Sequence, residues 1–188
     1  YLLDGLALAR TVDFLRLVRG ALANLGNLAM SRGDFHVVEA YLEEANAISD
    51  AIGEPSYARF TLSVLGDLRY RLGQFEASHA AYTQAHAFSV PLQDQEGVAD
   101  ALWGQARAAR ALMQFERAEQ LCGAAHAQYS AMHHEQGISW VAQVRAAIAC
   151  DQRRLPEALA LYRDALAIRL KYADGQGFTR VLDEAAHV

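Results

Sequence analysis

The chain repeats itself at a fixed interval, and this internal period constrains the fold more than any other feature. Gly33 and Gly73 stand 40 residues apart, each opening a Gly/polar/Phe triplet that recurs in weaker form at 113–115 and 153–155. Other positions keep the same register with residues of one kind, as in Leu22, Leu62, Leu102 and Ala142, or Ala45, Ala85, Ala125 and Ala165. Periods of this length are typical of solenoids, in which each repeat is one small structural unit that packs on its neighbours.

Each repeat predicts two helices, which we call helix A and helix B. In the first repeat, apolar residues recur at spacings of three and four over 15–32 and again over 35–52, which is the helical period. Gly33 separates the two segments and can adopt the positive φ that often ends a helix. Asp94 and Asp174 stand where an N-cap of the next helix A is expected, whereas Pro91 predicts an early end or a kink in the second helix B.

The pattern places four helix pairs in a single array over 1–188, with an incomplete repeat at each end. The pairs cover 15–52, 55–92, 95–132 and 135–172. Residues 1–12 match the end of a preceding helix B, and residues 176–188 match the start of a further helix A. We therefore interpret the chain as a segment of a longer array.

Composition excludes several classes of protein. The formal net charge is −5 and the sequence pI is about 5.8, which disfavours direct nucleic-acid binding because that binding needs a basic face. No apolar run approaches the roughly 20 residues of a membrane span. The two cysteines, Cys122 and Cys150, lie inside helical patterns without CxxC spacing, which favours reduced thiols and a cytoplasmic location.

The repeat pattern resembles the tetratricopeptide repeat. The residues that carry the resemblance in the first unit are Leu22, Leu25, Gly26, Gly33, Phe35, Val38, Leu42 and Ala45. The match weakens in the third and fourth units, where Gln105 and Arg145 replace an expected leucine. The resemblance implies an all-α, right-handed superhelical solenoid of antiparallel helix pairs that binds another protein or a peptide.

The length of the repeat indicates which group of tetratricopeptide-repeat proteins the chain resembles. The common tetratricopeptide repeat has about 34 residues, so the longer repeat here implies that each helix is extended. With Gln95, Glu96 and Gly97 opening one helix A, the chain is similar to the C-terminal repeat arrays of large bacterial signal-transduction ATPases and transcriptional activators. The long repeats also resemble those of peptide-pheromone receptors. A sensory or scaffolding role is what these resemblances imply.

In the tetratricopeptide fold, helix A lines a concave groove. The side chains that fall on the inward face of successive A helices include four aromatic residues and several arginines, and we predict a peptide-binding groove from Asn27, Phe60, Asp67, Tyr70, Arg71, Asp100, Trp103, Arg107, Arg110, Trp140 and Gln143. Tryptophan, tyrosine and arginine are the residues that most often anchor interfaces.

Two interpretations of this groove stay open. In the first, it binds an acidic or C-terminal peptide with apolar anchors, since arginine pairs well with carboxylates. In the second, the aromatic residues only fill space between neighbouring helices. Gln105 and Arg145 pose a related question, because an unpaired polar group buried in place of leucine is costly; either the helices rotate there or a partner group satisfies these side chains.

The sequence contains no motif that indicates catalysis, a cofactor or a bound metal. There is no Gly-rich phosphate loop, no GxSxG and no Cys/His signature. His79 and His86 are seven residues apart, as are His126 and His133, whereas helical zinc pairs prefer a spacing of four. We expect no enzyme activity, no cofactor and no bound metal.

The leading hypothesis is a protein- or peptide-binding scaffold, the regulatory or sensory segment of a larger bacterial signalling or transcription-regulating protein. A peptide-pheromone or small-ligand sensor is the second hypothesis. A stand-alone scaffold that forms a homodimer through terminal helices, with 178–182 exposed for pairing, is the third.

Overall fold

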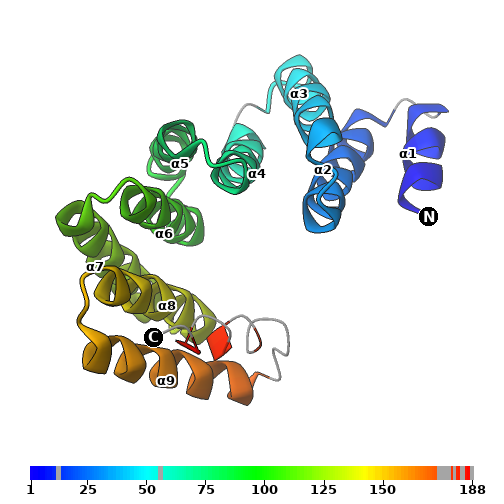
Figure 1. The fold of residues 1–188 in the computed structure, drawn as a ribbon. Helices are drawn as coiled ribbons and strands as arrows, with labels where there is room; N and C mark the ends of the chain where they lie inside the picture. Colours follow the sequence, from blue (N-terminus) through cyan, green and yellow to red (C-terminus); the bar gives the residue numbers. More distant parts are fainter. Residues whose placement is uncertain (12–13, 55–56, 173–178, 180, 183–184, 187–188) are drawn as a thin grey trace. The chain divides into compact units, whose positions relative to one another are not determined.

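A computed structural model describes residues 1–188 except 12–13, 55–56, 173–178, 180, 183–184 and 187–188. Within this described part, every regular element is an α-helix, and the helices follow one another along the chain (Figure 1). The all-α helical-repeat fold predicted from the sequence is confirmed.

The chain divides into two compact units, Tyr1–Gln93 and Asp94–Val188. Unit 1 contains α1 (Leu2–Thr11), α2 (Leu15–Arg32), α3 (Phe35–Ala51), α4 (Ala58–Arg71) and α5 (Phe75–Ser89). Unit 2 contains α6 (Gln95–Ala111), α7 (Phe115–Ala131), α8 (Glu135–Asp151) and α9 (Leu155–Lys171). The strongest contacts join α2 to α3, α4 to α5, α6 to α7 and α8 to α9, so helix A and helix B of each repeat pack as a pair.

Proline shortens one helix. In the repeat register, Pro91 corresponds to Ala51, Ala131 and Lys171, the last residues of α3, α7 and α9, whereas α5 already ends at Ser89. Proline has no N–H to donate and its ring clashes with the preceding turn. The early end expected from the sequence is therefore observed.

The turn between helix A and helix B keeps one backbone conformation while its residue type changes. Gly33 and Gly73 have φ of 81° and 74°, and Met113 and Arg153 hold the same left-handed conformation at 61° and 62°. This conformation costs an L-residue roughly 1–2 kcal/mol relative to glycine. Two turns of unit 2 therefore carry strain that the corresponding turns of unit 1 avoid.

Replacing Met113 with glycine is expected to stabilise unit 2 by up to about 1 kcal/mol, because relief of the left-handed strain exceeds the entropy that glycine adds to the unfolded chain. Met113 is 68% exposed, so little packing is lost. Urea unfolding measures the change. The reverse substitution Gly73→Met serves as the control and should destabilise, and a loss of stability in Met113→Gly would contradict the argument.

Two side chains cap helices in unit 2. Asp94 Oδ1 accepts a hydrogen bond from the Gly97 N–H at 3.0 Å, which confirms the N-cap predicted for α6. His134 Nδ1 accepts from the Gly137 N–H at the same distance and caps α8, a cap that the residue type alone did not predict. Asp174, the other predicted cap, lies outside the described residues.

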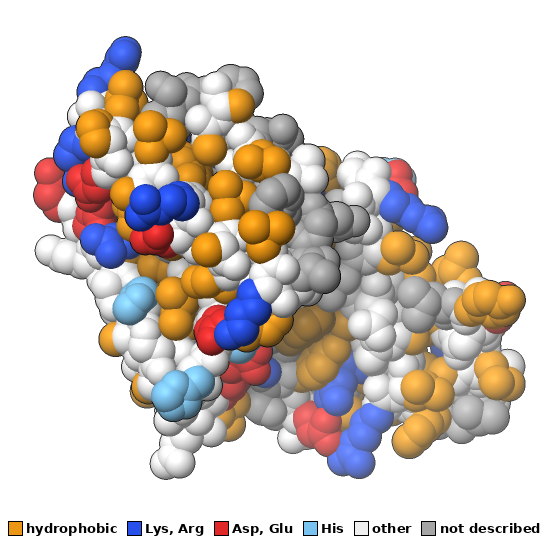
Figure 2. All heavy atoms as spheres, turned by 90° about the horizontal axis from the view of Figure 1, so that it is seen from below, with side chains coloured by type: hydrophobic (Ala, Val, Ile, Leu, Met, Phe, Trp, Pro, Cys, Tyr) orange, Lys and Arg blue, Asp and Glu red, His pale blue; other side chains and the backbone are white. Residues whose placement is uncertain are grey.

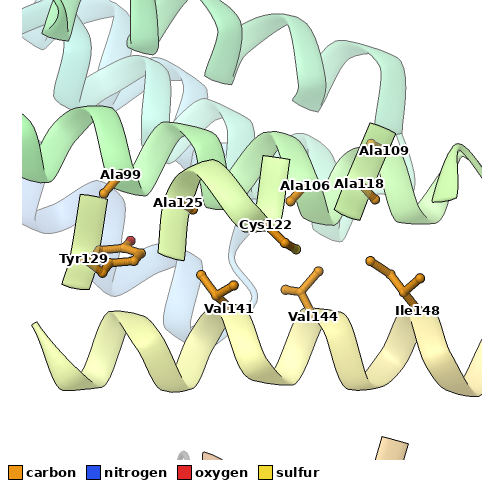
Figure 3. Packing of buried hydrophobic residues seen from close by; sticks show 10 residues of the cluster. All are labelled: Ala99, Ala106, Ala109, Ala118, Cys122, Ala125, Tyr129, Val141, Val144 and Ile148. Atoms are coloured by element: carbon orange, nitrogen blue, oxygen red, sulfur yellow. The ribbon is translucent and has the colours of Figure 1, made fainter. Parts of the chain in front are cut away.

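The core of unit 2 joins three helices (Figure 3). Val141, Val144 and Ile148 of α8 point toward α7, where Cys122 and Tyr129 meet them. The remaining positions are alanines, and they let the helices approach closely: Ala99, Ala106, Ala109, Ala118 and Ala125. Tyr129 is the largest fully buried side chain of the described chain, and it is the one aromatic ring among the fully buried residues of this core.

Unit 1 builds its cores from larger aliphatic residues. Leu22, Val38, Leu42 and Leu68 are fully buried. A Cβ on Gly26 would stand 3.5 Å from the Leu42 side chain, and one on Gly66 would stand 2.7 Å from the Tyr82 ring. The small residues of this repeat position thus lie where helix B presses against helix A.

The two polar residues in leucine positions differ in their surroundings. Gln105 is 8% exposed and therefore buried. Arg145 keeps 41% of its side chain exposed, and its Nε donates to Glu119 of α7 at 3.1 Å. For Arg145, a partner carboxylate and water replace the leucine contacts.

The structure describes the predicted helix at the N-terminal end but only part of the one at the C-terminal end. Residues 1–12 contain α1, as expected from the repeat register. The prediction for 176–188 lies largely outside the described residues, although Val181 is fully buried and packs with Ala146, Tyr162 and Ala165.

Candidate functional site

Unit 2 brings two of the predicted groove residues together. Trp103 of α6 and Trp140 of α8 lie with ring centroids 5.6 Å apart at 38°. Trp140 also contacts Tyr129 edge-on at 6.1 Å and His134 at 5.7 Å. Both tryptophans are partly buried and pack on the core of unit 2, so this aromatic pair is continuous with the core and still reaches the surface.

An arginine lies against this aromatic pair. The Arg107 guanidinium lies over the Trp103 ring, 4.5 Å from its centroid, a distance at which a cation is attracted by the ring. We call Trp103, Arg107 and Trp140 the aromatic face of unit 2. It places one positive charge beside two indoles that water can reach in part.

Arg110 forms an ion pair with Asp151 of the same unit. Its Nε and Nη2 donate to the two carboxylate oxygens of Asp151 at 2.8 and 3.2 Å. The side chains are 30% and 32% exposed, so the pair lies near the surface and joins the ends of α6 and α8. A peptide carboxylate could bind Arg110 only in competition with Asp151.

Asp100 and Gln143 also contact the protein itself. The Tyr129 hydroxyl donates to Asp100 Oδ1 at 2.5 Å. Gln143 is 8% exposed, and its Oε1 accepts from Arg169 Nη2 of α9 at 3.1 Å. These two predicted groove residues connect helices of unit 2.

In unit 1 the predicted residues do not gather in one place. Phe60 pairs with Tyr57, with ring centroids 5.7 Å apart, at the start of α4. Tyr70 pairs with Phe75 at 5.4 Å, at the other end of the same helix. Asp67 accepts from the Tyr82 hydroxyl at 2.8 Å, while Asn27 and Arg71 are exposed.

A charged cluster in unit 1 was not predicted. Glu54 accepts from Arg19 at 2.7 Å and pairs with Arg16 at 2.5 Å, and Arg19 lies over the Tyr57 ring at 4.1 Å. The hydrogen bond from Arg19 is the main reason that the pKa of Glu54 is lowered, and burial raises the pKa of Tyr57. This cluster ties α2 to the connection before α4, and the repeat pattern carries no signal for it because Glu54 lies between helices.

Unit 1 also contains a cleft of about 450 Å³. Its lining comes from α1, α2 and the start of α3 and is mostly apolar: Tyr1, Leu3, Leu25, Leu28, Ala29, Arg32, Asp34, Val37 and Tyr41. The charged residues of the lining, Arg32 and Asp34, are two positions apart along the chain, on either side of Gly33.

Two further features of the described part of the chain concern metal ligands and the buried cysteine. No group of three or more His, Cys, Asp or Glu residues there could hold a metal ion. Burial raises the pKa of the Cys122 thiol to about 12, so the nucleophilic thiolate is scarce at neutral pH. Among the described residues, no helix combines the length and apolar character required to cross a membrane.

Comparison with known proteins supports the fold. Neither a known family profile nor a curated protein sequence matches this chain. Its structure is similar to the crystal structure of BtubC (BKLC) from P. vanneervenii, with a TM-score of 0.72 and 19% sequence identity over 99% of this chain and 87% of that chain. At this level of identity the likeness concerns the fold alone.

Proposed function

We propose that this chain is a protein- or peptide-binding repeat of the long tetratricopeptide type. The 40-residue register, the paired helices and the left-handed turn at Gly33 and Gly73 support the repeat type. Stacked helix pairs offer an extended surface, which is the property that repeat proteins use to bind partners.

The observation that carries the proposal is the aromatic face of unit 2. Trp103 and Trp140 are partly exposed although large aromatic side chains gain most from full burial. Arg107 over Trp103 adds a cation at the same place. Tryptophan and arginine at the centre of a contact provide most of its binding free energy, so this face suits an apolar side chain of a partner.

The arrangement of charge refines the ligand that we propose. Arg107 lies directly over the Trp103 ring, so it is the arginine that a ligand carboxylate can meet beside an apolar group held on the indoles. The proposed ligand is therefore a peptide that sets an apolar side chain on the indoles and an acidic group beside Arg107.

Substitution of Arg107 tests this proposal directly. Arg107→Ala is expected to weaken peptide binding about tenfold, which corresponds to about 1.4 kcal/mol. A displayed library of random 12-residue peptides supplies the ligands, and tryptophan fluorescence measures their affinity. The chain has two tryptophans, both on the proposed face, so the signal comes from the site itself.

Arg117→Ala is the matched control, because Arg117 is an exposed arginine on α7 whose side chain donates to Gln114. It should leave the affinity unchanged, with circular dichroism confirming that both variants keep their helices. Failure to select any peptide that shifts tryptophan emission, or equal affinity for wild type and Arg107→Ala, would reject the proposed site.

We further propose a cytoplasmic regulatory role within a larger bacterial signalling protein, which the resemblance of the long repeats supports. The cleft of unit 1 is mostly apolar, and its two charged residues, Arg32 and Asp34, come from one short stretch of the chain. It therefore gives less support to a small-ligand sensor than the aromatic face gives to a peptide-binding adaptor.

A further inference from the structure

His134 caps the start of α8 in the same way that Asp94 caps the start of α6. The two residues occupy the same position in successive repeats of the 40-residue register. Asp94 Oδ1 accepts from the Gly97 N–H and His134 Nδ1 accepts from the Gly137 N–H, both at 3.0 Å. The two caps thus make the same hydrogen bond with different acceptors, and of these two residue types it is histidine that ordinarily changes charge between about pH 5 and 8.

The hydrogen bond fixes the protonation state of the His134 ring. A backbone N–H can only donate, so Nδ1 must be unprotonated and the neutral ring carries its proton on Nε2. If Nδ1 gains a proton, two donors face each other and the Gly137 N–H loses its acceptor. The new positive charge also lies at the N-terminal end of α8, where the helix dipole disfavours a cation. The cap therefore exists only while His134 is neutral.

The same ring is part of the aromatic surroundings of Trp140. It stacks on Tyr129 with ring centroids 5.3 Å apart at 26°, and its centroid lies 5.7 Å from that of Trp140 at 60°. These rings would attract an imidazolium, but they offer no acceptor to the Gly137 N–H. A charged His134 therefore cannot keep the cap, and any movement of its ring reaches Trp140 through direct contact.

The ring contacts and chain neighbours of His134 connect it to titratable groups on every helix of unit 2. They are Asp100 of α6, bonded to the hydroxyl of Tyr129 of α7; His133; Glu135 of α8; and Lys171 and Tyr172 of α9. The hydrogen bond from Lys171 is the main cause that lowers the pKa of Glu135, so this carboxylate stays ionised throughout the range in which histidine titrates. His133 is exposed and has to be separated from His134 by experiment.

We propose that His134 is a pH-sensitive cap that couples the start of α8 and the Trp140 side of the aromatic face to the protonation of one histidine. Near pH 8 the neutral ring caps α8 and contacts Trp140. Near pH 5.5 the proton removes the cap, the first turn of α8 loosens and the ring leaves Trp140. The inference concerns the free protein, and its consequence for a bound peptide, weaker binding at acid pH, rests on the proposed function.

The sign of the stability change follows from the bond. The folded chain holds His134 in its neutral form, whereas the unfolded chain leaves the ring free to gain a proton. The stability that the cap contributes is therefore present near pH 8 and is lost as the pH falls through the range in which histidine ordinarily titrates.

His134→Asp tests the proposal because it copies the cap of α6, and a carboxylate accepts from N–H groups throughout this range. Urea unfolding of the full chain is measured near pH 8 and near pH 5.5. Between these conditions the folding equilibrium constant of the wild type should fall up to about tenfold more than that of the variant, the most that one histidine of ordinary proton affinity supplies. The variant lacks the ring stacked on Tyr129 at both pH values, so the two pH dependences are compared and not the stabilities at one pH.

The other histidines require a control. His36, His126 and His133 are exposed, and histidine side chains are visible on the surface in Figure 2. His133→Asn is the matched control, because it removes the neighbouring imidazole and asparagine tolerates the positive φ of 54° at this position. This variant should keep the pH dependence of the wild type.

Two further measurements on the free chain examine the ring and the face. The imidazole ¹⁵N resonances of His134, identified by their absence from His134→Asp, should show an unprotonated Nδ1 near pH 8. The tryptophan emission maximum should move to longer wavelength near pH 5.5 in the wild type and stay constant in His134→Asp. A protonated Nδ1 near pH 8, or an equal pH dependence of wild type and His134→Asp, would overturn the proposal, and an unmoved emission maximum would overturn its link to the aromatic face. If the free chain responds to pH as stated and no peptide is selected, the pH-sensitive cap stands and the proposed binding function fails.

Discussion

Replacing Tyr129 with alanine is expected to lower the free energy of unfolding of unit 2 by about 3–5 kcal/mol, the usual cost of removing a large aromatic side chain from a core. Tyr129 is fully buried in the core of three helices, where its ring also stacks on His134 and meets Trp140 edge-on. The alanines and valines of this core are too short to fill the space that the ring would leave. Urea unfolding followed by tryptophan fluorescence measures the loss, because Trp103 and Trp140 both lie in this unit.

Tyr129→Phe separates the ring from its hydroxyl. This variant keeps the packing and loses the hydrogen bond to Asp100, which should cost about 2 kcal/mol because the acceptor is charged. The alanine variant must therefore be clearly less stable than the phenylalanine variant. Equal stability of the two would contradict the assigned role of the ring.

Gly137→Ala is expected to destabilise unit 2 by about 1–3 kcal/mol through overpacking. A Cβ at Gly137 would stand 2.3 Å from Cδ1 of Tyr129 and 2.5 Å from Cε1. The ring has no exposed surface into which it could turn. The cap from His134 uses the backbone N–H of residue 137, which alanine retains, so the measured loss reports the steric contact.

A double-mutant cycle provides the control for this contact. In the Tyr129→Ala background, Gly137→Ala should be close to neutral, because the ring that it would strike is gone. Gly123→Ala in α7 is the matched single substitution, since its Cβ would meet nothing within 4 Å. It should stabilise by about 0.5–1 kcal/mol through helix propensity. Additive losses in the cycle would mean that Gly137 and Tyr129 do not compete for the same space.

The sequence by itself determined the helices and their turns. Apolar spacing and the glycine after helix A placed α2 at Leu15–Arg32, the range expected from the pattern. The early end of α5 before Pro91 and the Asp94 cap also followed from residue type. These features are local, since a helix end depends on a few neighbouring backbone groups.

The tertiary structure decided what the polar and aromatic side chains of the predicted groove contact. Arg110 donates to Asp151, which is 41 residues away in the sequence. Gln143 accepts from Arg169, which is 26 residues away. Helical period assigns a residue to a face, and it says nothing about which side chain of another helix meets it there. The same holds for Gly137, whose contact with Tyr129 appears only when α7 and α8 pack.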